Sequence, residues 1–322
     1  MQTSVERPPI LLGFEFRGRT RQSFAAAYDI VGAIERPDPR LITPEIAGRA
    51  RALVTVGSLG ASDALLAALP NVSIICCYGS GYENIDLEAA RRRGIMVTHS
   101  PGANAPEVAD IAMALLLAST RRVARADRFI RAGQWASRTA PRFGPVAGLG
   151  GRRLGILGLG AIGLLVARRA LGFDLEIGYH NRRPRADAPW PYFDNLHALA
   201  EWADYLVVAC RADESNRHMI DAEVLRALGP RGHIVNVARG SMIDEAALAE
   251  ALAGEVIEGA GLDVFEQEPR VHPKLQTLEN VVMTPHLGGG TERGIEAMTE
   301  MVLRNLAAHF SGQPAVSPVP TT

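Results

Sequence analysis

Short apolar runs alternate with amphipathic segments along almost the whole chain. In the first third, the runs predict strands at Ile10–Phe14, Ala52–Val56, Ser73–Cys77 and Ile95–Thr98. Later runs predict strands just before Gly158 and at Leu175–Tyr179, Tyr205–Ala209, Ile234–Val237, Gly259–Asp263 and Val281–Thr284. Strands that alternate with helices are typical of parallel sheets rather than of sandwiches. We therefore expect an α/β fold built on doubly wound, Rossmann-like sheets.

The helical segments differ in how apolar they are. Short helices are expected at Ser23–Tyr28, Ala61–Leu69 and Leu87–Arg93. After a break rich in Pro and Gly at residues 101–106, one long helix is expected from Glu107 to Ala132. Its residues 111–118 are apolar on nearly every side, which predicts burial between domains or subunits. A last helix, Glu292–Phe310, is expected to return to the first domain, and residues 314–322 are expected to form a loose tail.

A glycine run marks the change from one strand to the next helix. Gly158, Gly160 and Gly163 lie between an apolar strand and the helical segment Leu164–Leu171. In this setting the first glycine permits a tight turn, the second lets a pyrophosphate approach, and the third allows close helix packing. Glycines also end strands for structural reasons alone, but the flanking elements favour a dinucleotide site. Its contacts are expected from Gly158, Leu159, Gly160, Ala161, Ile162 and Gly163.

The end of the second strand should select the coenzyme. An NAD site places an acid there for the ribose hydroxyls. This chain has His180-Asn181-Arg182-Arg183-Pro184-Arg185 instead. Guanidinium groups pair with phosphate in bidentate geometry, so Asn181, Arg182 and Arg183 favour NADP with NADPH preferred, and NAD remains possible. The alternative is a solvated basic loop.

Composition excludes several kinds of function. The 322 residues suggest two domains, and the net charge of −1 gives no field that would attract nucleic acid or an anionic membrane. The single lysine, Lys274, follows a proline, which argues against a Schiff-base or phosphate-loop lysine. Cys76, Cys77 and Cys210 lie in apolar runs and the histidines are scattered, so we expect neither a disulfide nor a metal site. With no signal peptide or membrane-spanning run, we expect a cytoplasmic protein.

Three residues with useful chemistry follow the later strands. They are Arg239, Glu268 and His286. Each also has a purely structural interpretation, with Arg239 as a turn residue, Glu268 as a solvated loop acid and His286 as a capping residue. Together they suit the reduction of a 2-oxo acid, which needs a cation for the carboxylate and ketone and an acid for the carbonyl oxygen. We expect Arg239 as the cation, His286 as the acid, and Glu268 as the carboxylate that orients the imidazole and favours its protonated form.

With these motifs the chain resembles the D-isomer specific 2-hydroxyacid dehydrogenase family over nearly its full length. The resemblance lies in Asn236-Val237-Ala238-Arg239-Gly240, Gly261-Leu262-Asp263-Val264-Phe265 with Glu268-Pro269, and Thr284-Pro285-His286. Within the family it is most similar to glyoxylate, hydroxypyruvate and hydroxyphenylpyruvate reductases that prefer NADPH.

The resemblance also implies contacts. Substrate carboxylate contacts are implied for Val56, Gly57, Ser80 and Gly81, beside Arg239 and His286, through loops that present backbone N–H groups. Further coenzyme contacts are implied for Cys210, Arg211, Val237, Ala238, Arg239, Asp263, His286 and Gly288. Arg211 stands where the family often has proline. Leu287 and the glycines 288–290 follow the histidine where the family often has a small residue and serine, which implies a wider pocket floor here than in relatives.

The resemblance implies a substrate domain of residues 1–102 and 287–322, with an NAD(P)-binding domain of 103–286 between the two segments. The expected reaction is NADPH-dependent reduction of a short 2-oxo acid, glyoxylate or hydroxypyruvate, to the D-2-hydroxy acid. Trp135 matches a tryptophan on the dimer side, which predicts a homodimer, whereas the tryptophan that closes the partner's pocket in some glyoxylate reductases is replaced near Arg138. Two alternatives stay open: a reductase of bulkier acids such as hydroxyphenylpyruvate, and a non-catalytic regulator that senses NAD(P)H.

Overall fold

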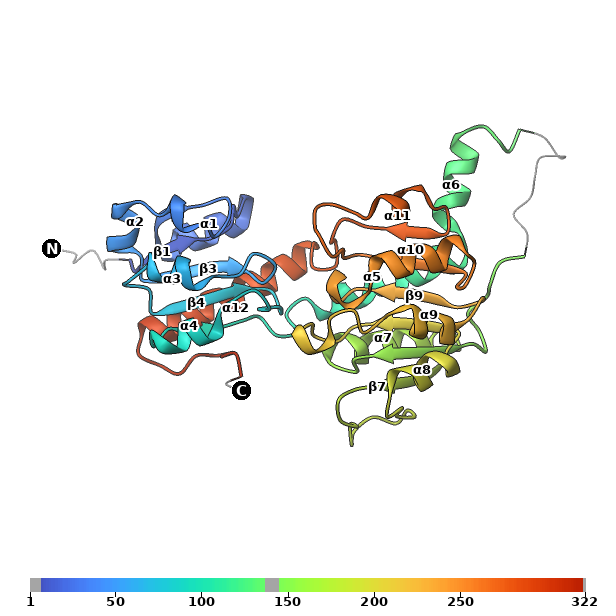
Figure 1. The fold of residues 1–322 in the computed structure, drawn as a ribbon. Helices are drawn as coiled ribbons and strands as arrows, with labels where there is room; N and C mark the ends of the chain where they lie inside the picture. The colour runs from blue at the N-terminus through green and yellow to red at the C-terminus, as the bar shows by residue number, and fades with distance from the viewer. Residues whose placement is uncertain (1–6, 137–144, 321–322) are drawn as a thin grey trace. The chain divides into compact units, whose positions relative to one another are not determined.

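The computed structural model describes residues 7–136 and 145–320 and divides the chain into two compact units (Figure 1). Unit 1 consists of Met1–Asn104 and Thr291–Thr322, and unit 2 consists of Ala105–Gly290. The structure divides the chain after residues 104 and 290, whereas the sequence predicts domain boundaries after residues 102 and 286. The position near Arg138 lies outside the described residues.

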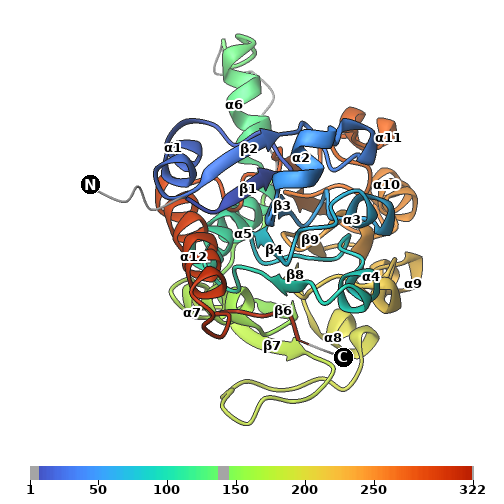
Figure 2. The same ribbon diagram turned by 90° about the vertical axis from the view of Figure 1, so that its left-hand side faces the viewer.

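Unit 1 contains a five-stranded parallel sheet in the order β2-β1-β3-β4-β5 (Figure 2). Its strands are β1 (Pro9–Leu12), β2 (Asp29–Ala33), β3 (Ala52–Val56), β4 (Ile74–Tyr78) and β5 (Met96–Thr98). Strand order reverses between β1 and β3, as in doubly wound folds. The loops after β3 and β4 therefore emerge next to each other at the carboxyl edge.

Helices cover both faces of this sheet. On one face, α1 (Gly18–Ala27) and α12 (Glu292–Phe310) bury Phe24, Val302 and Leu306. On the other face lie α2 (Pro44–Arg49), α3 (Asp63–Ala67) and α4 (Leu87–Arg92). Cys76 faces the first layer and Cys77 the second, and both side chains are buried, as expected for small core residues. The C-terminal helix thus completes the core of the N-terminal sheet.

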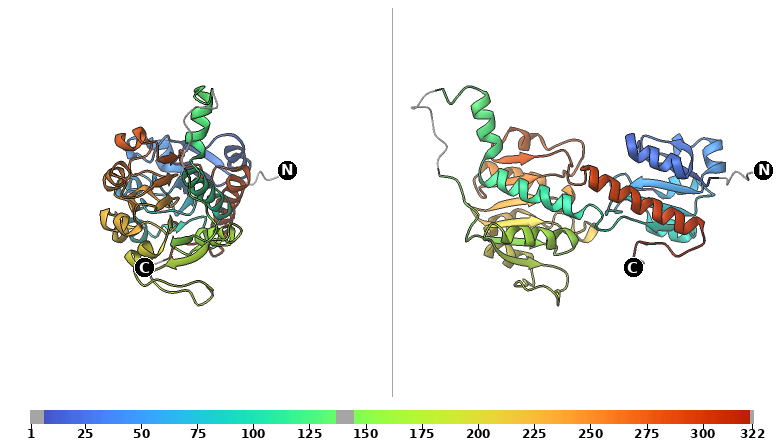
Figure 3. Two further views of the ribbon diagram at one scale, coloured as in Figure 1. Left: turned by 90° about the vertical axis from the view of Figure 1, so that its right-hand side faces the viewer. Right: turned by 180° about the vertical axis from the view of Figure 1, so that it is seen from behind.

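Unit 2 contains a six-stranded parallel sheet in the order β11-β10-β9-β8-β6-β7. Figure 3 gives two further views of the ribbon. Its strands are β6 (Arg153–Leu157), β7 (Glu176–His180), β8 (Tyr205–Val208), β9 (His233–Asn236), β10 (Gly259–Leu262) and β11 (Val281–Met283). The switch point lies between β6 and β8, where ligands bind in open α/β sheets. The expected fold of two doubly wound α/β sheets is confirmed.

Helices also cover both faces in unit 2. One face carries α5 (Ala105–Thr120) and α7 (Ala161–Leu171). The other carries α8 (Leu196–Trp202), α9 (Ala222–Leu228), α10 (Glu245–Ala253) and α11 (Pro273–Thr277). Short 3₁₀ turns occur at Pro39–Leu41, Glu214–Asn216 and Gly240–Met242. Among the described residues, no helix is both long and apolar enough to cross a membrane.

The long helix expected at Glu107–Ala132 is wrong as a single element. It consists of α5 and α6 (Val123–Arg131), separated at Arg122, whose φ of 53° is left-handed. A right-handed helix cannot continue through such a residue. The apolar side chains of α5 pack on α7 and β10 of their own unit. In contrast, α6 buries no residue and stands away from the sheet (Figure 1).

The described part of the C-terminal tail is also not the loose segment that the sequence predicted. Pro318 forms an antiparallel bridge with Thr98, and Val319 donates its N–H to the carbonyl of Val97 at 2.9 Å. Ser317 and Val319 are each 8% exposed. Backbone hydrogen bonds to the edge strand β5 hold this segment in place. Such bonds require no hydrophobic side chains, so this Pro- and Ser-rich sequence carries no pattern that would predict them.

Candidate active site

The glycine loop between β6 and α7 has the shape that a dinucleotide requires. Gly158 has φ +99°, and a Cβ there would lie 2.5 Å from Cys210 Cα. A Cβ on Gly163 would overlap the carbonyl of Gly158, whereas a Cβ on Gly160 would meet nothing within 4 Å. The first and third glycines are therefore needed for packing. The open space beside Gly160, at the start of α7, fits the approach of a pyrophosphate.

A cavity of about 700 Å³ opens beside this loop. It brings together the predicted coenzyme residues Gly158, Leu159, Gly160, Asn181, Arg182, Arg183, Cys210 and Arg211. Its lining also includes Arg185, Ser215 and Asn216, which sequence reasoning did not assign to a site. Arg185 stands in the basic run and could have been included, but the other two follow β8 without a recognisable signal. Burial raises the pKa of Cys210 to about 11, so its thiol is an uncharged part of the wall.

Several polar residues that line or adjoin this cavity form hydrogen bonds or ion pairs with the protein. Asn181 accepts a hydrogen bond from the N–H of Leu159 at 2.7 Å, which ties the end of β7 to the glycine loop. Asp213 lies 3.1 Å from a guanidinium nitrogen of Arg211 and 3.8 Å from one of Arg182. Two cations from different strand ends thus share one acid. This arrangement leaves positive charge where a ribose phosphate would lie and places no acid at the end of β7.

Arg239 follows β9 in a turn shaped by the buried Asn236. The Asn236 side chain accepts from the N–H of Ala238 at 3.0 Å and donates to the carbonyl of Arg239 at 2.9 Å. The next residue, Gly240, packs so tightly on Phe265 that a Cβ would overlap the backbone there. The turn after β9 therefore contacts the loop after β10, which carries Glu268.

Glu268 and His286 form a direct pair. His286 Nδ1 donates to Glu268 Oε2 at 2.8 Å, and the other carboxylate oxygen accepts from the N–H of Phe265 at 3.0 Å. Burial acts to raise the pKa of Glu268, but the hydrogen bonds from His286 and Phe265 and the charges of His286 and Arg239 lower it overall. Glu268 is therefore held as a carboxylate, and His286 Nε2 is left for a substrate.

Asp263 organises the loop that presents His286. It is 2% exposed and accepts from Thr284 Oγ1 at 2.6 Å, from the N–H of Leu287 at 2.7 Å and from the N–H of Gly288 at 2.9 Å. The coenzyme contacts that the sequence assigns to Asp263 and Gly288 stay a prediction. Their hydrogen bonds show that both residues also shape the histidine loop.

A second buried acid, Glu245, supports the same region and was not found from the sequence. It accepts from the N–H of Glu266 at 2.6 Å, and burial raises its pKa. Glu266 in turn pairs with Arg217 and lies 2.7 Å from His218 Nε2. Glu245 lies at the start of α10, where an acid is ordinary helix-capping chemistry, so its sequence carries no functional signal.

The predicted substrate-loop residues lie together in unit 1. Val56 and Gly57 end and follow β3, and Ser80 and Gly81 follow β4. A Cβ on Gly57 would overlap the carbonyl of Gly81, so the two loops are in contact. The roles that the sequence assigns to them stay a prediction.

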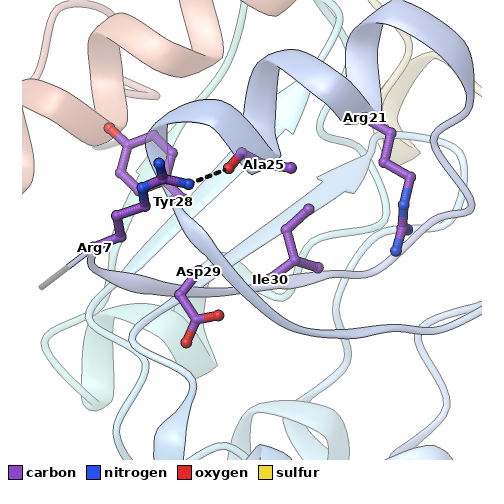
Figure 4. A pocket seen from close by; sticks show the side chains of 6 residues that line it. All are labelled: Arg7, Arg21, Ala25, Tyr28, Asp29 and Ile30. Atoms are coloured by element: carbon purple, nitrogen blue, oxygen red, sulfur yellow. Dashed lines mark hydrogen bonds between the residues drawn. The ribbon is translucent and has the colours of Figure 1, made fainter.

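A different cavity in unit 1, of about 530 Å³, lies beside α1 and β2 (Figure 4). Arg7 donates to the carbonyl of Ala25 at 2.8 Å, and Asp29 is paired with Arg49 at 2.5 Å. Two of its charged groups, Arg7 and Asp29, are thus held by protein partners. Within the described ranges, no group of three or more His, Cys, Asp or Glu residues could hold a metal ion.

Residues 113–288 match the family described as D-isomer specific 2-hydroxyacid dehydrogenase, NAD binding domain. The chain is also 41% identical over 276 residues to a glyoxylate/hydroxypyruvate reductase of Arabidopsis thaliana, covering 86% of this chain and 85% of that protein. The chain belongs to the D-isomer specific 2-hydroxyacid dehydrogenase family. The resemblance seen in the Arg239, Glu268 and His286 motifs is therefore confirmed at the level of the family.

Two other members of this family resemble the chain closely. A hydroxyphenylpyruvate reductase of Plectranthus scutellarioides is 41% identical over 272 residues, covering 84% of this chain and 85% of that protein. The structure of an NADPH-dependent glyoxylate/hydroxypyruvate reductase of Sinorhizobium meliloti, solved with NADP and malonate, superposes with a TM-score of 0.91. It is 38% identical, and the match covers 98% of this chain and 97% of that one. Unit 2 is thus the NAD-binding domain of a family dehydrogenase.

Proposed function

We propose that this protein is an NADPH-dependent reductase that converts a short 2-oxo acid, glyoxylate or hydroxypyruvate, to the D-2-hydroxy acid. The observation that carries the proposal is the hydrogen bond between His286 and Glu268, beside Arg239, in an NAD-binding domain. The glyoxylate/hydroxypyruvate reductases among its relatives support the substrate class.

The coenzyme preference is proposed from the cavity beside the glycine loop. Arg182, Arg183 and Arg211 line it, and His180 and Asn181 stand at the end of β7 in place of an acid. Guanidinium groups suit a ribose phosphate, whereas an NAD site uses an acid for the ribose hydroxyls. The S. meliloti relative, described as NADPH-dependent and solved with NADP, supports the same choice.

The roles of the three catalytic candidates follow from their contacts. When bound, the reduced nicotinamide supplies a hydride to the carbonyl carbon. His286 donates the proton from Nε2 to the carbonyl oxygen, because its Nδ1–H is held by Glu268. Arg239 pairs with the carboxylate and polarises the carbonyl. Glu268 fixes the ring orientation and stabilises the charged imidazolium.

The first test compares initial rates of NADPH and NADH oxidation with glyoxylate and hydroxypyruvate. We expect wild type to prefer NADPH, and Arg182→Ala/Arg183→Ala to lose that preference through a roughly 10- to 100-fold fall in kcat/KM for NADPH, since charge-assisted hydrogen bonds are removed. Rates with NADH should change little. Arg91→Ala/Arg92→Ala, which removes two exposed arginines of α4, is the matched control for lost charge.

If neither coenzyme is oxidised with these acids or with larger analogues, the catalytic proposal fails and the NAD(P)H-sensing regulator replaces it. The intact His286–Glu268 pair argues against that regulator, because coenzyme sensing alone does not need a proton donor.

A bulkier substrate such as hydroxyphenylpyruvate is the second candidate. The glycines 288–290 after His286 leave little side-chain volume there, and the hydroxyphenylpyruvate reductase is as similar in sequence as the Arabidopsis enzyme. The ratio of kcat/KM for hydroxypyruvate to that for 4-hydroxyphenylpyruvate separates the two candidates.

The oligomeric state and location are proposed on separate grounds. A homodimer is supported by the apolar side chains that α6 and its following segment expose, Val123, Ile130 and Trp135. A cytoplasmic location is supported by Cys76, Cys77 and Cys210, because none of the three forms a disulfide.

A further inference from the structure

The loop that follows β4 turns consecutive carbonyl groups toward the protein. The carbonyl of Gly79 accepts from the N–H of Ser100 at 2.7 Å, and the carbonyl of Ser80 accepts from His99 Nδ1 at 2.9 Å. In a trans peptide the C=O and N–H bonds point in opposite directions. The N–H groups of Ser80 and Gly81 are therefore turned away from these partners.

These two N–H groups are available to an anion. In the part of the chain that the structure describes, neither of them has a hydrogen-bond partner, and both residues are partly exposed. Successive backbone N–H groups that point to one side form a concavity for a carboxylate or phosphate. Their direction depends on whatever holds the carbonyl groups behind them.

His99 holds the second of these peptides. A carbonyl oxygen only accepts, so the ring nitrogen that faces Ser80 must carry a hydrogen. The ring also meets Tyr82 edge to face, with centroids 5.1 Å apart and an interplanar angle of 83°. Tyr82 is 8% exposed, so the imidazole packs against a buried side chain. One hydrogen bond and one packed ring contact thus orient His99.

The backbone of His99 is held by the C-terminal strap, which we define as Ser317–Val319. Ser317 Oγ donates to the carbonyl of His99 at 2.6 Å, and the N–H of His99 donates to the carbonyl of Ser317 at 3.1 Å. Asn305 of α12, which is 1% exposed, accepts from the N–H of Ser317 at 3.1 Å and donates to its Oγ at 2.8 Å. The strap therefore connects α12 with the loop after β4.

We propose that His99, fixed by the C-terminal strap, is a positioning residue that aims the N–H groups of Ser80 and Gly81 at the carboxylate of the 2-oxo acid. The inference rests on the proposed function for the identity of the anion. It assigns a part in substrate binding to two segments of unit 1 that carry no proposed reacting group: the residue after β5 and the C-terminal strap.

Two substitutions of His99 separate its hydrogen bond from its bulk. His99→Phe keeps a ring beside Tyr82 but has no ring N–H, whereas His99→Asn places an amide nitrogen near the position of Nδ1. Hydrogen–deuterium exchange of the segment 74–86 measures the result without any substrate. We expect exchange roughly tenfold faster in His99→Phe and in Ser317→Ala, and close to wild type in His99→Asn. Equal exchange in His99→Phe and wild type overturns the proposal.

The second measurement is the split between KM and kcat for hydroxypyruvate. In His99→Phe we expect KM to rise roughly tenfold with a smaller change in kcat, and the Kd for NADPH, followed by coenzyme fluorescence, to stay the same. His99→Asn should restore KM. An unchanged KM in a folded His99→Phe enzyme contradicts the substrate role. If wild type reduces no 2-oxo acid while the exchange result holds, the proposed function fails and the positioning of the loop stands.

Discussion

At the scale of single residues, His286 combines a strained backbone with a fixed side chain. Its φ of 54° is left-handed, a conformation that costs a residue other than glycine roughly 1 kcal/mol or more. Asp263 offsets this cost by accepting hydrogen bonds from Thr284, Leu287 and Gly288 around the turn. The ring is then held by Glu268, so the backbone and the side chain of His286 are fixed by two different acids.

These contacts predict different kinetic effects for substitutions of His286 and Arg239. His286→Ala should lower kcat by roughly 10² to 10⁴, the usual contribution of a general acid, while the Kd for NADPH stays near wild type. Arg239→Ala should also raise KM for the 2-oxo acid, because a carboxylate partner is lost. Steady-state kinetics and coenzyme fluorescence measure both effects. Normal turnover in His286→Ala would falsify the mechanism.

At the scale of elements, we expect Gly158 and Gly160 of the glycine loop to differ, the first being needed for packing and the second for coenzyme binding. Gly158→Ala should lower the free energy of unfolding by about 2 kcal/mol or more, since the Cβ meets Cys210 at a positive φ. Gly160→Ala should change that free energy little, because its Cβ enters open space. It should still weaken NADPH binding, since we propose that the pyrophosphate occupies the same space. Urea unfolding and coenzyme titration of the pair check this, and equal stability losses would contradict it.

The strand β9 begins with a buried histidine that gives a pH signature. Burial lowers the pKa of His233 to about 4 from its ordinary value of 6.5, with Glu258 acting to raise it and Arg122 to lower it. Between these values the unfolded chain binds a proton that the folded chain does not. The free energy of unfolding should therefore fall by roughly 1 to 3 kcal/mol as the pH drops from about 6.5 to about 4.

His233→Gln should remove most of that slope. The exposed His197 of α8 provides the control, because His197→Gln should leave the slope unchanged. Urea unfolding at a series of pH values measures both. A slope that persists in His233→Gln would assign the pH dependence to other groups.

The sequence predicted the elements whose hydrophobic pattern reflects burial. It did not predict the features that depend on backbone conformation or backbone hydrogen bonds. The strand Ala52–Val56 and the helix Glu292–Phe310 were predicted with their observed bounds, since both carry strong apolar periodicity. The edge strand β2 was missed because it is only half-buried and contains Gly32. Nothing in the sequence around Arg122 indicated that its left-handed backbone separates α5 from α6. In the candidate site, positions after strand ends pointed to Arg239 and His286, whereas Glu245 contacts the region through the backbone N–H of Glu266, which leaves no sequence signal.

At the scale of the whole molecule, the apolar surface of α6 predicts self-association. Val123 and Ile130 are more than half exposed and Trp135 is 69% exposed, so the segment offers apolar area that no described residue of its own unit covers. We expect wild type to sediment as a dimer and Ile130→Asp/Trp135→Ala to sediment as a monomer. Arg128→Ala on the same helix should remain dimeric. A monomeric wild type would show that the homodimer proposal is wrong.

The return of α12 to the first sheet has a consequence for synthesis on the ribosome. Unit 2 is complete once Gly290 has been added, but one face of the unit 1 sheet is covered by α1 without α12 until Val302 and Leu306 arrive. The segment translated first should therefore be the last to finish folding. In nascent chains arrested beyond Gly290, we expect unit 2 to resist protease while residues 7–104 are still cleaved. Equal protection of both would mean that the N-terminal sheet folds without its last helix.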